Sequence, residues 1–167
     1  FMKNTKNNLN FSYKNPPLII AEISGNHNGS KSRFLKLIKK ACESGADLIK
    51  IQTYEPEDIT LSKKNKFLRI KSGIWKGKYF FDLYKKACTP YKWHHSAFKI
   101  AKKYNKIIFS SPFSIKAVNF LEKFNVPIYK IASFEITDYN LISYIASKKK
   151  PIIISTGMAT IKEIKSA

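Results

Sequence analysis

Short apolar runs alternate with amphipathic segments along most of the chain, and this alternation constrains the fold more than any other feature. Each amphipathic segment repeats its apolar residues at helical spacing. Repeated strand-then-helix units predict a parallel sheet with right-handed crossovers. The five runs that have the length and composition of buried strands are residues 18–23, 47–53, 107–111, 128–133 and 151–156.

Two architectures fit such units, an open doubly wound sheet and a (β/α)8 barrel. No Gly-x-Gly-x-x-Gly follows any run, which weakens the nucleotide-binding open sheet. Polar residues lie at the carboxyl ends of all five runs instead, and in a barrel the carboxyl ends of the strands converge on one mouth. These residues are Glu22, Lys50, Gln52, Ser111, Lys130, Ser133, Glu135, Ser155 and Thr156. We therefore predict an α/β fold of the TIM (β/α)8 type.

The predicted barrel is incomplete, because five units cannot close an eight-stranded ring. We expect a polar leader at residues 1–16, and residues 17–167 to form the N-terminal part of a barrel in a longer protein. An insertion at residues 54–89 separates the second and third units, and its many aromatic side chains predict an ordered excursion. Thr89 and Pro90 are expected to be the cap and the first-turn proline of the next helix. Three other helices are expected to start at Ser30, Ser114 and Asp138.

The formal charge of +20 is compatible with a nucleic-acid partner. The lysines, however, are spread over the polar sides of nearly all predicted helices, and only Arg33 and Arg69 could read bases. We expect no nucleic-acid partner and keep a basic nucleic-acid-binding module as an alternative. The two cysteines, Cys42 and Cys88, are expected to be reduced and structural.

No membrane segment is expected, because the sequence contains no run of about 18 uncharged apolar residues. Residues 1–14 lack the apolar centre of a signal peptide. The expectation is a cytoplasmic protein with no membrane partner.

Lys130 interrupts the apolar run 128–133. A lysine in the middle of a buried strand must be paired, neutral or functional, unless it reaches water from an edge strand. Lys50 has a similar place in run 47–53, where Glu22 could meet it. Two lysines among the hydroxyls of Ser111, Ser133 and Ser155 predict a site for a phosphate or carboxylate.

Glu22 and Glu135 would face the same mouth and could hold hydroxyl groups or transfer protons. A different enzyme class is also possible, in which Lys130 is the Schiff-base nucleophile of an aldolase. The serine-rich surroundings argue against that alternative, because they stabilise the charged form of the amine.

Five motifs together resemble the sialic acid synthase family. They are IAEISGNHN at 20–28, GADLIKIQTY at 45–54, SSPF at 110–113, YKIASFE at 129–135 and STGMA at 155–159. Within the insertion, WKGK at 75–78, LY at 83–84 and TPYKWH at 89–94 resemble the pseudaminic acid synthase branch of that family.

The resemblance implies a transferase of carbohydrate biosynthesis. Such enzymes condense phosphoenolpyruvate with an acetamido sugar aldehyde, release phosphate and make a nine-carbon 2-keto acid. It implies that one set of residues holds phosphoenolpyruvate, namely Lys50, Ser111, Lys130, Ser133 and Ser155. It further implies that Glu22, Gln52 and Glu135 face the sugar, with Glu22 or Glu135 transferring a proton.

The family also implies a divalent metal, manganese or similar, and a homodimer. Its metal ligands are two histidines on later strands, and a C-terminal domain lends an arginine across the dimer; this chain contains none of these. We therefore expect the chain alone to have little or no activity. His94 and His95 are expected at the surface or in packing, and His27 either shapes its loop or lines the sugar side of the mouth.

Overall fold

The structure, a computed structural model, describes residues 14–167. Most of the predicted polar leader lies outside this range. Within it, no helix is both long enough and apolar enough to cross a bilayer.

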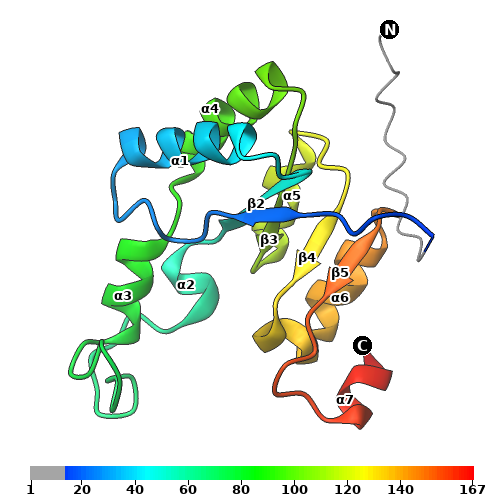
Figure 1. Cartoon of the computed structure of the whole chain (residues 1–167). Coiled ribbons are helices and arrows are strands. Elements are labelled where there is room, and N and C mark those ends of the chain that lie inside the picture. Colours follow the sequence, from blue (N-terminus) through cyan, green and yellow to red (C-terminus); the bar gives the residue numbers. More distant parts are fainter. Residues whose placement is uncertain (1–13) are drawn as a thin grey trace, which may run out of the picture.

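Five parallel strands form one sheet and lie side by side in the order of the sequence (Figure 1). They are β1 (Ile20–Glu22), β2 (Leu48–Thr53), β3 (Ile107–Pro112), β4 (Tyr129–Ile131) and β5 (Ile152–Ile154). The order never reverses, whereas a doubly wound sheet reverses at its ligand crevice. The sequential order agrees with the predicted barrel and excludes the open doubly wound alternative.

A helix follows each strand along the chain. They are α1 (Lys31–Glu43), α4 (Tyr91–Lys103), α5 (Ile115–Glu122), α6 (Tyr139–Ala146) and α7 (Ile161–Ser166). Helices α1 and α4 share a core with Ile49, Ile51 and Ile108, and helices α5 and α6 share one with Tyr129 and Ile131.

The opposite face of the sheet has its own small core. Leu48, Phe109 and Ile128 are buried there, against the partly buried Ile20 and Ile153. An outer layer of helices and an inner layer of strand side chains are the two layers of a (β/α) barrel. The chain thus forms a partial barrel, and we call the face with Phe109 the inner face.

The predicted helix starts at Ser30, Ser114 and Asp138 are confirmed. Each of these side chains accepts a hydrogen bond from the backbone N–H three residues later, as an N-cap should. The predicted cap at Thr89 is wrong. Helix α4 begins at Tyr91 after Pro90, and the Thr89 hydroxyl is 3.2 Å from Nε2 of His27, a buried partner that the local pattern did not reveal.

The insertion contains two helices, α2 (Pro56–Ile59) and α3 (Phe80–Ala87). Between them the chain makes an antiparallel bridge that pairs Arg69 with Tyr79. This connecting segment extends away from the sheet, while α2 and α3 remain close to it (Figure 1).

Candidate active site

The carboxyl ends of the strands place charged and polar side chains on the inner face. Glu22 and Lys50 are register partners on β1 and β2, and Gln52 and Ser111 are partners on β2 and β3. Side chains two residues apart on a strand share a face, so Lys50 and Gln52 lie on the same face as Leu48 of the inner core. The structure therefore brings these four predicted site residues to one mouth.

Glu22 and Lys50 form an ion pair, which is one of the arrangements that their places in the sequence allow. The Lys50 side chain is only 17% exposed, so its ammonium group has lost most of its hydration. The carboxylate of Glu22 compensates for this loss. The other oxygen of Glu22 accepts hydrogen bonds from the backbone N–H and the hydroxyl of Ser24, both at 2.9 Å. The carboxylate is thereby held in one orientation.

Lys130 points to the same inner face, because its neighbours Tyr129 and Ile131 both pack against the helices. Its Nζ donates to Ser155 Oγ at 2.6 Å and to the carbonyl oxygen of Ile131 at 2.7 Å. Strand β4 has neighbours on both sides, so the edge-strand explanation of this lysine is wrong. Burial, and next the nearby charge of Lys50, lower the pKa of Lys130.

Glu135 lies beside this mouth, in the short 3-10 helix η1 (Ser133–Thr137) that follows β4. Its Oε2 is buried and has no hydrogen-bond partner among the described residues. Burial raises the pKa of this carboxyl, and Lys130 partly opposes the shift. Glu135 is therefore the acidic side chain of the mouth that is best placed to hold a proton.

Ser133 approaches the loop after β5. A Cβ added at Gly157 would lie 3.1 Å from Ser133 Oγ, so the glycine leaves room for this hydroxyl. The backbone N–H of Ser155 donates to the carbonyl oxygen of Ile131 at 3.0 Å, which fixes Ser155 beside β4. Both serines thus lie near the end of β4, as expected.

Three aromatic side chains stand beside the ends of β2 and β3. The ring of Tyr54 contacts Phe113 at 5.2 Å and Tyr84 at 6.2 Å between centroids. Tyr84 belongs to α3, so the insertion contributes to this group. Burial, and next the negative charge of Glu135, raise the pKa of Tyr84.

The histidines have structural environments. His27 is fully buried, with its ring 5.7 Å from Phe34 and 5.3 Å from Trp93 between centroids. Its Nδ1 accepts a hydrogen bond from the backbone N–H of Gly29 at 3.0 Å. Of the two predicted roles, shaping the loop is the one observed. His94 is buried in packing and His95 is exposed.

The described residues contain no group of three or more His, Cys, Asp or Glu side chains that could hold a metal ion. Glu22 is paired with Lys50. Residues 14–167 therefore do not form a metal site by themselves. Cys42 and Cys88 are free cysteines, in agreement with the prediction.

A buried polar group on the helix side of the sheet was not predicted. It consists of Thr53 at the end of β2, Ser110 on β3 and His94 on α4, all fully buried. The signal was present in the sequence, because Thr53 and Ser110 are polar positions on strand faces that otherwise carry Ile49, Ile51 and Ile108.

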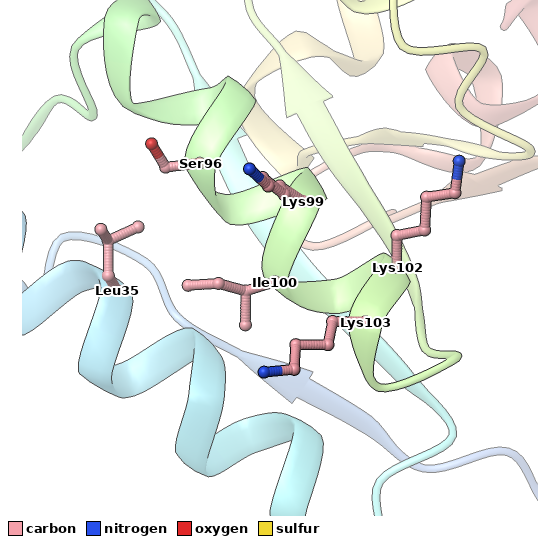
Figure 2. A pocket seen from close by; sticks show the side chains of 6 residues that line it. All are labelled: Leu35, Ser96, Lys99, Ile100, Lys102 and Lys103. Carbon is pink, nitrogen blue, oxygen red and sulfur yellow. The ribbon is translucent and has the colours of Figure 1, made fainter.

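A surface cavity lies away from the mouth. It has a volume of about 580 Å³ and lies between α1 and α4, where Leu35 and Ile100 are accompanied by lysines of α4 (Figure 2). Because α1 and α4 cover the helix side of the sheet, this cavity is not on the inner face.

Comparisons with known proteins agree with this geometry. The NeuB family profile matches residues 37–167. The chain is 46% identical to the pseudaminic acid synthase of Campylobacter jejuni (strain NCTC 11168), over 93% of this chain and 45% of that protein. It is 45% identical to the pseudaminic acid synthase of Helicobacter pylori (strain 26695), over 91% of this chain and 45% of that protein.

A solved structure shows the same partial barrel. The N-acetylneuraminic acid synthetase of Leptospira borgpetersenii superposes with a TM-score of 0.77 at 30% identity, over 91% of this chain and 48% of that chain. The chain thus spans a little under half the length of these proteins. Because the family profile covers most of the sequence and the fold agrees over nine-tenths of the chain, this protein belongs to the NeuB family.

Proposed function

We propose that this chain provides the phosphoenolpyruvate site of a synthase of the pseudaminic acid type. The observation that carries the proposal is the placement of Lys50 and Lys130 on one inner face, with the Ser155 hydroxyl bonded to Lys130 and Ser111 on the adjacent strand. Phosphoenolpyruvate carries a phosphate and a carboxylate close together. Two ammonium groups among hydroxyl donors complement that pair of anions.

The two lysines would respond differently to the ligand. Lys50 is paired with Glu22, so a bound anion would share or replace this carboxylate. Lys130 has no carboxylate among its hydrogen-bond partners, and burial has lowered its pKa. A bound anion would favour its charged form again. We assign Ser111, Ser133 and Ser155 as further donors to the ligand.

The condensation requires few protein groups. Carbon 3 of phosphoenolpyruvate attacks the carbonyl carbon of the open-chain sugar, and the aldehyde oxygen takes a proton. The cation that forms at carbon 2 captures water, which loses one proton. The carbon–oxygen bond to phosphate then breaks while the new hydroxyl passes its remaining proton to the departing phosphate, which leaves a 2-keto acid. We assign proton donation to Glu135, because burial raises its pKa, and deprotonation of the water to Glu22. Gln52 would bind a sugar hydroxyl.

The divalent metal of the family would polarise the aldehyde or orient the water. The described residues do not supply its ligands, so we assign no step of this chain to it.

The remaining assignments rest on the relatives. Both pseudaminic acid synthases named above are more than twice as long as the region that this chain matches. We infer an acetamido sugar aldehyde as the second substrate, a homodimer for a protein of that length, and little activity for residues 1–167 alone. We also infer that residues 17–167 form one barrel segment, with the insertion at residues 54–89.

Ligand binding by the chain itself tests the proposal. Phosphoenolpyruvate should bind in isothermal titration calorimetry, and Lys130→Met should weaken binding roughly 10- to 100-fold, the value of a hydrogen bond to a charged group. Lys123→Met is the matched control, because Lys123 is exposed at the end of α5. Equal affinity of the two variants would contradict the assignment of Lys130.

Activity requires a second experiment. A chain extended to the length of the relatives should release phosphate from phosphoenolpyruvate in the presence of manganese and an altrose-type diacetamido sugar. Glu135→Gln in that protein should lower kcat more than it raises KM for phosphoenolpyruvate, because a proton donor acts in the transition state. Absence of phosphate release from the unsubstituted protein would reject the synthase function.

One observation favours a second function. The lowered pKa of Lys130 would make its amine more nucleophilic, as a Schiff-base aldolase requires. Borohydride reduction in the presence of a 2-keto acid would then attach the keto acid to Lys130. The synthase function predicts no such product.

A further inference from the structure

The most unusual buried group outside the mouth is the chain of hydrogen bonds formed by His94, Thr53 and Ser110. His94 Nε2 is 2.8 Å from Thr53 Oγ1, which is 2.7 Å from Ser110 Oγ. Ser110 Oγ donates in turn to the carbonyl oxygen of Ile51 at 3.1 Å. The chain of bonds therefore runs from α4 through the end of β2 to β3 and back to β2.

The carbonyl oxygen of Ile51 only accepts, so the hydroxyl of Ser110 donates to it. The tautomer of His94 sets the direction of the other bonds: with the proton on Nε2 the ring donates to Thr53, and with the proton on Nδ1 it accepts from Thr53. Nδ1 is 3.3 Å from the carbonyl oxygen of Pro90. Burial lowers the pKa of His94 to about 4, so the ring is neutral and has one proton for its two contacts.

Burying these three polar side chains in the core costs free energy. Apolar side chains of the same size would pack there without the desolvation of three polar groups. The polar side chains found buried in residues 14–167 nevertheless cluster near the carboxyl ends of the strands and the start of α4; they are His27, Thr53, Thr89, His94, Ser110 and Ser111. The desolvation cost is thus concentrated in the segments that position the residues of the mouth.

The group lies directly behind two proposed ligand residues. Gln52 precedes Thr53 and Ser111 follows Ser110, and Gln52 and Ser111 are register partners on the inner face. Thr53 and Pro112 are the last register pair of β2 and β3. The side-chain bonds therefore add a cross-strand connection at the carboxyl end of these two strands.

We propose that His94 is a positioning residue: through Thr53 and Ser110 it holds Gln52 and Ser111 in the arrangement that the ligand needs. The role in binding rests on the proposed phosphoenolpyruvate site. The mechanical part, that His94 orders the ends of β2 and β3, does not depend on that function.

The test uses the whole chain and three variants. His94→Phe keeps a ring but removes its nitrogens, and His94→Gln keeps an N–H donor near the position of Nε2. His95→Phe is the matched control on the exposed side of the same helix. Amide hydrogen exchange followed by NMR measures local order, and calorimetry with phosphoenolpyruvate measures binding.

We expect His94→Phe to lower the exchange protection of Gln52 and Ser111 about three- to tenfold, the value of one net hydrogen bond, while residues of β4 keep theirs. The dissociation constant for phosphoenolpyruvate should rise by a similar factor. His94→Gln should recover most of both losses, and His95→Phe should match the unsubstituted chain.

Three outcomes would overturn the proposal: unchanged protection in His94→Phe, an equal loss across β2, β3 and β4, which would indicate global stability alone, or no recovery in His94→Gln. If His94→Phe does not fold, Thr53→Val removes the central hydroxyl with little change of shape and must show the same selective loss. If the unsubstituted chain binds no phosphoenolpyruvate, the proposed function fails, and the exchange data still decide the role of His94.

Discussion

At the scale of single residues, the two lysines of the mouth are accommodated in different ways. Lys50 is neutralised by Glu22, whereas Lys130 is held by a hydroxyl and a carbonyl oxygen, which carry no compensating charge. Buried cations without a counter-charge are costly. The structure tolerates this cost at the place where we propose that an anion binds.

Buried histidines make stability depend on pH. The pKa of His94 is about 4 in the folded protein, against about 6.5 for an unperturbed histidine, so the unfolded chain binds the proton first. Stability should therefore fall as the pH is lowered from 6.5 towards 4. Burial lowers the pKa of His27 as well, which acts in the same direction. The raised pKa of Glu135 acts in the opposite direction in acid.

Comparison with a variant that cannot titrate isolates the His94 contribution. Between pH 7 and pH 4.5, urea unfolding should show a loss of stability that is smaller in His94→Gln than in the unsubstituted chain by about 2 kcal/mol. His95→Gln should lose as much as the unsubstituted chain. Parallel pH curves for His94→Gln and the unsubstituted chain would contradict the buried neutral histidine.

At the scale of elements, a close contact attaches the insertion to the sheet. The loop after β1 meets the carboxyl end of α3, where Gly25 lies against Ala87, and the His27–Thr89 contact lies next to it. Helix α3 in turn carries Tyr84, whose ring contacts Tyr54 at the end of β2. The packing of this loop against α3 therefore controls how the insertion borders the mouth.

Gly25→Ala tests this packing. The new Cβ would lie 3.1 Å from both Cβ and the carbonyl oxygen of Ala87, so we expect a loss of about 1–3 kcal/mol in the free energy of unfolding. Ala87→Gly in the same chain removes one of the two clashing atoms. The double variant should be more stable than the sum of the single effects by about 0.5 kcal/mol or more, measured by urea unfolding. Strict additivity would show that the contact is not tight.

At the scale of the whole molecule, positive charge dominates. The chain has 31 lysine and arginine residues against 11 acidic ones, and its net charge is +20. Such an excess destabilises the compact state by self-repulsion, which salt screens. Ion pairs at the surface contribute little stability that salt could remove.

The melting temperature should therefore rise by a few degrees between about 20 and 300 mM NaCl, because 1 kcal/mol corresponds to roughly 2–4 °C for a domain of this size. KCl should act as NaCl does. Phosphate at equal ionic strength should stabilise further if it binds between Lys50 and Lys130, and Lys130→Met should lose only this extra increment. A melting temperature that falls with NaCl would contradict dominant self-repulsion.

The sequence predicted the elements of the fold well, because their signals are local. Alternation of apolar residues marked the strands, and Ser30, Ser114 and Asp138 marked helix starts, since a cap needs only the residues of the first turn. The predicted helix cap at Thr89 was wrong because the contact of this side chain is long-range. Its hydroxyl bonds with His27, which is 62 residues away, and no local pattern reports such a contact.

The candidate site was predicted in part for the same reason. Charged residues within apolar runs, such as Lys130, are unusual in any fold and were therefore visible in the sequence. Whether these side chains meet at one mouth depends on the order of the strands in the sheet, which cannot be predicted from composition. His94 was assigned only to the surface or to packing, because its hydrogen-bond partner Thr53 is 41 residues away along the chain.

By itself the sequence determined which residues are buried in strands and helices, and which polar side chains interrupt them, because both follow from periodicity and from the cost of burying charge. Only the tertiary structure decided that Glu22 meets Lys50, that Lys130 turns to the inner face with them, and that His94 lies behind β2 and β3. Those outcomes depend on sheet register and on long-range packing, in which residues far apart in the chain form hydrogen bonds and ion pairs with one another.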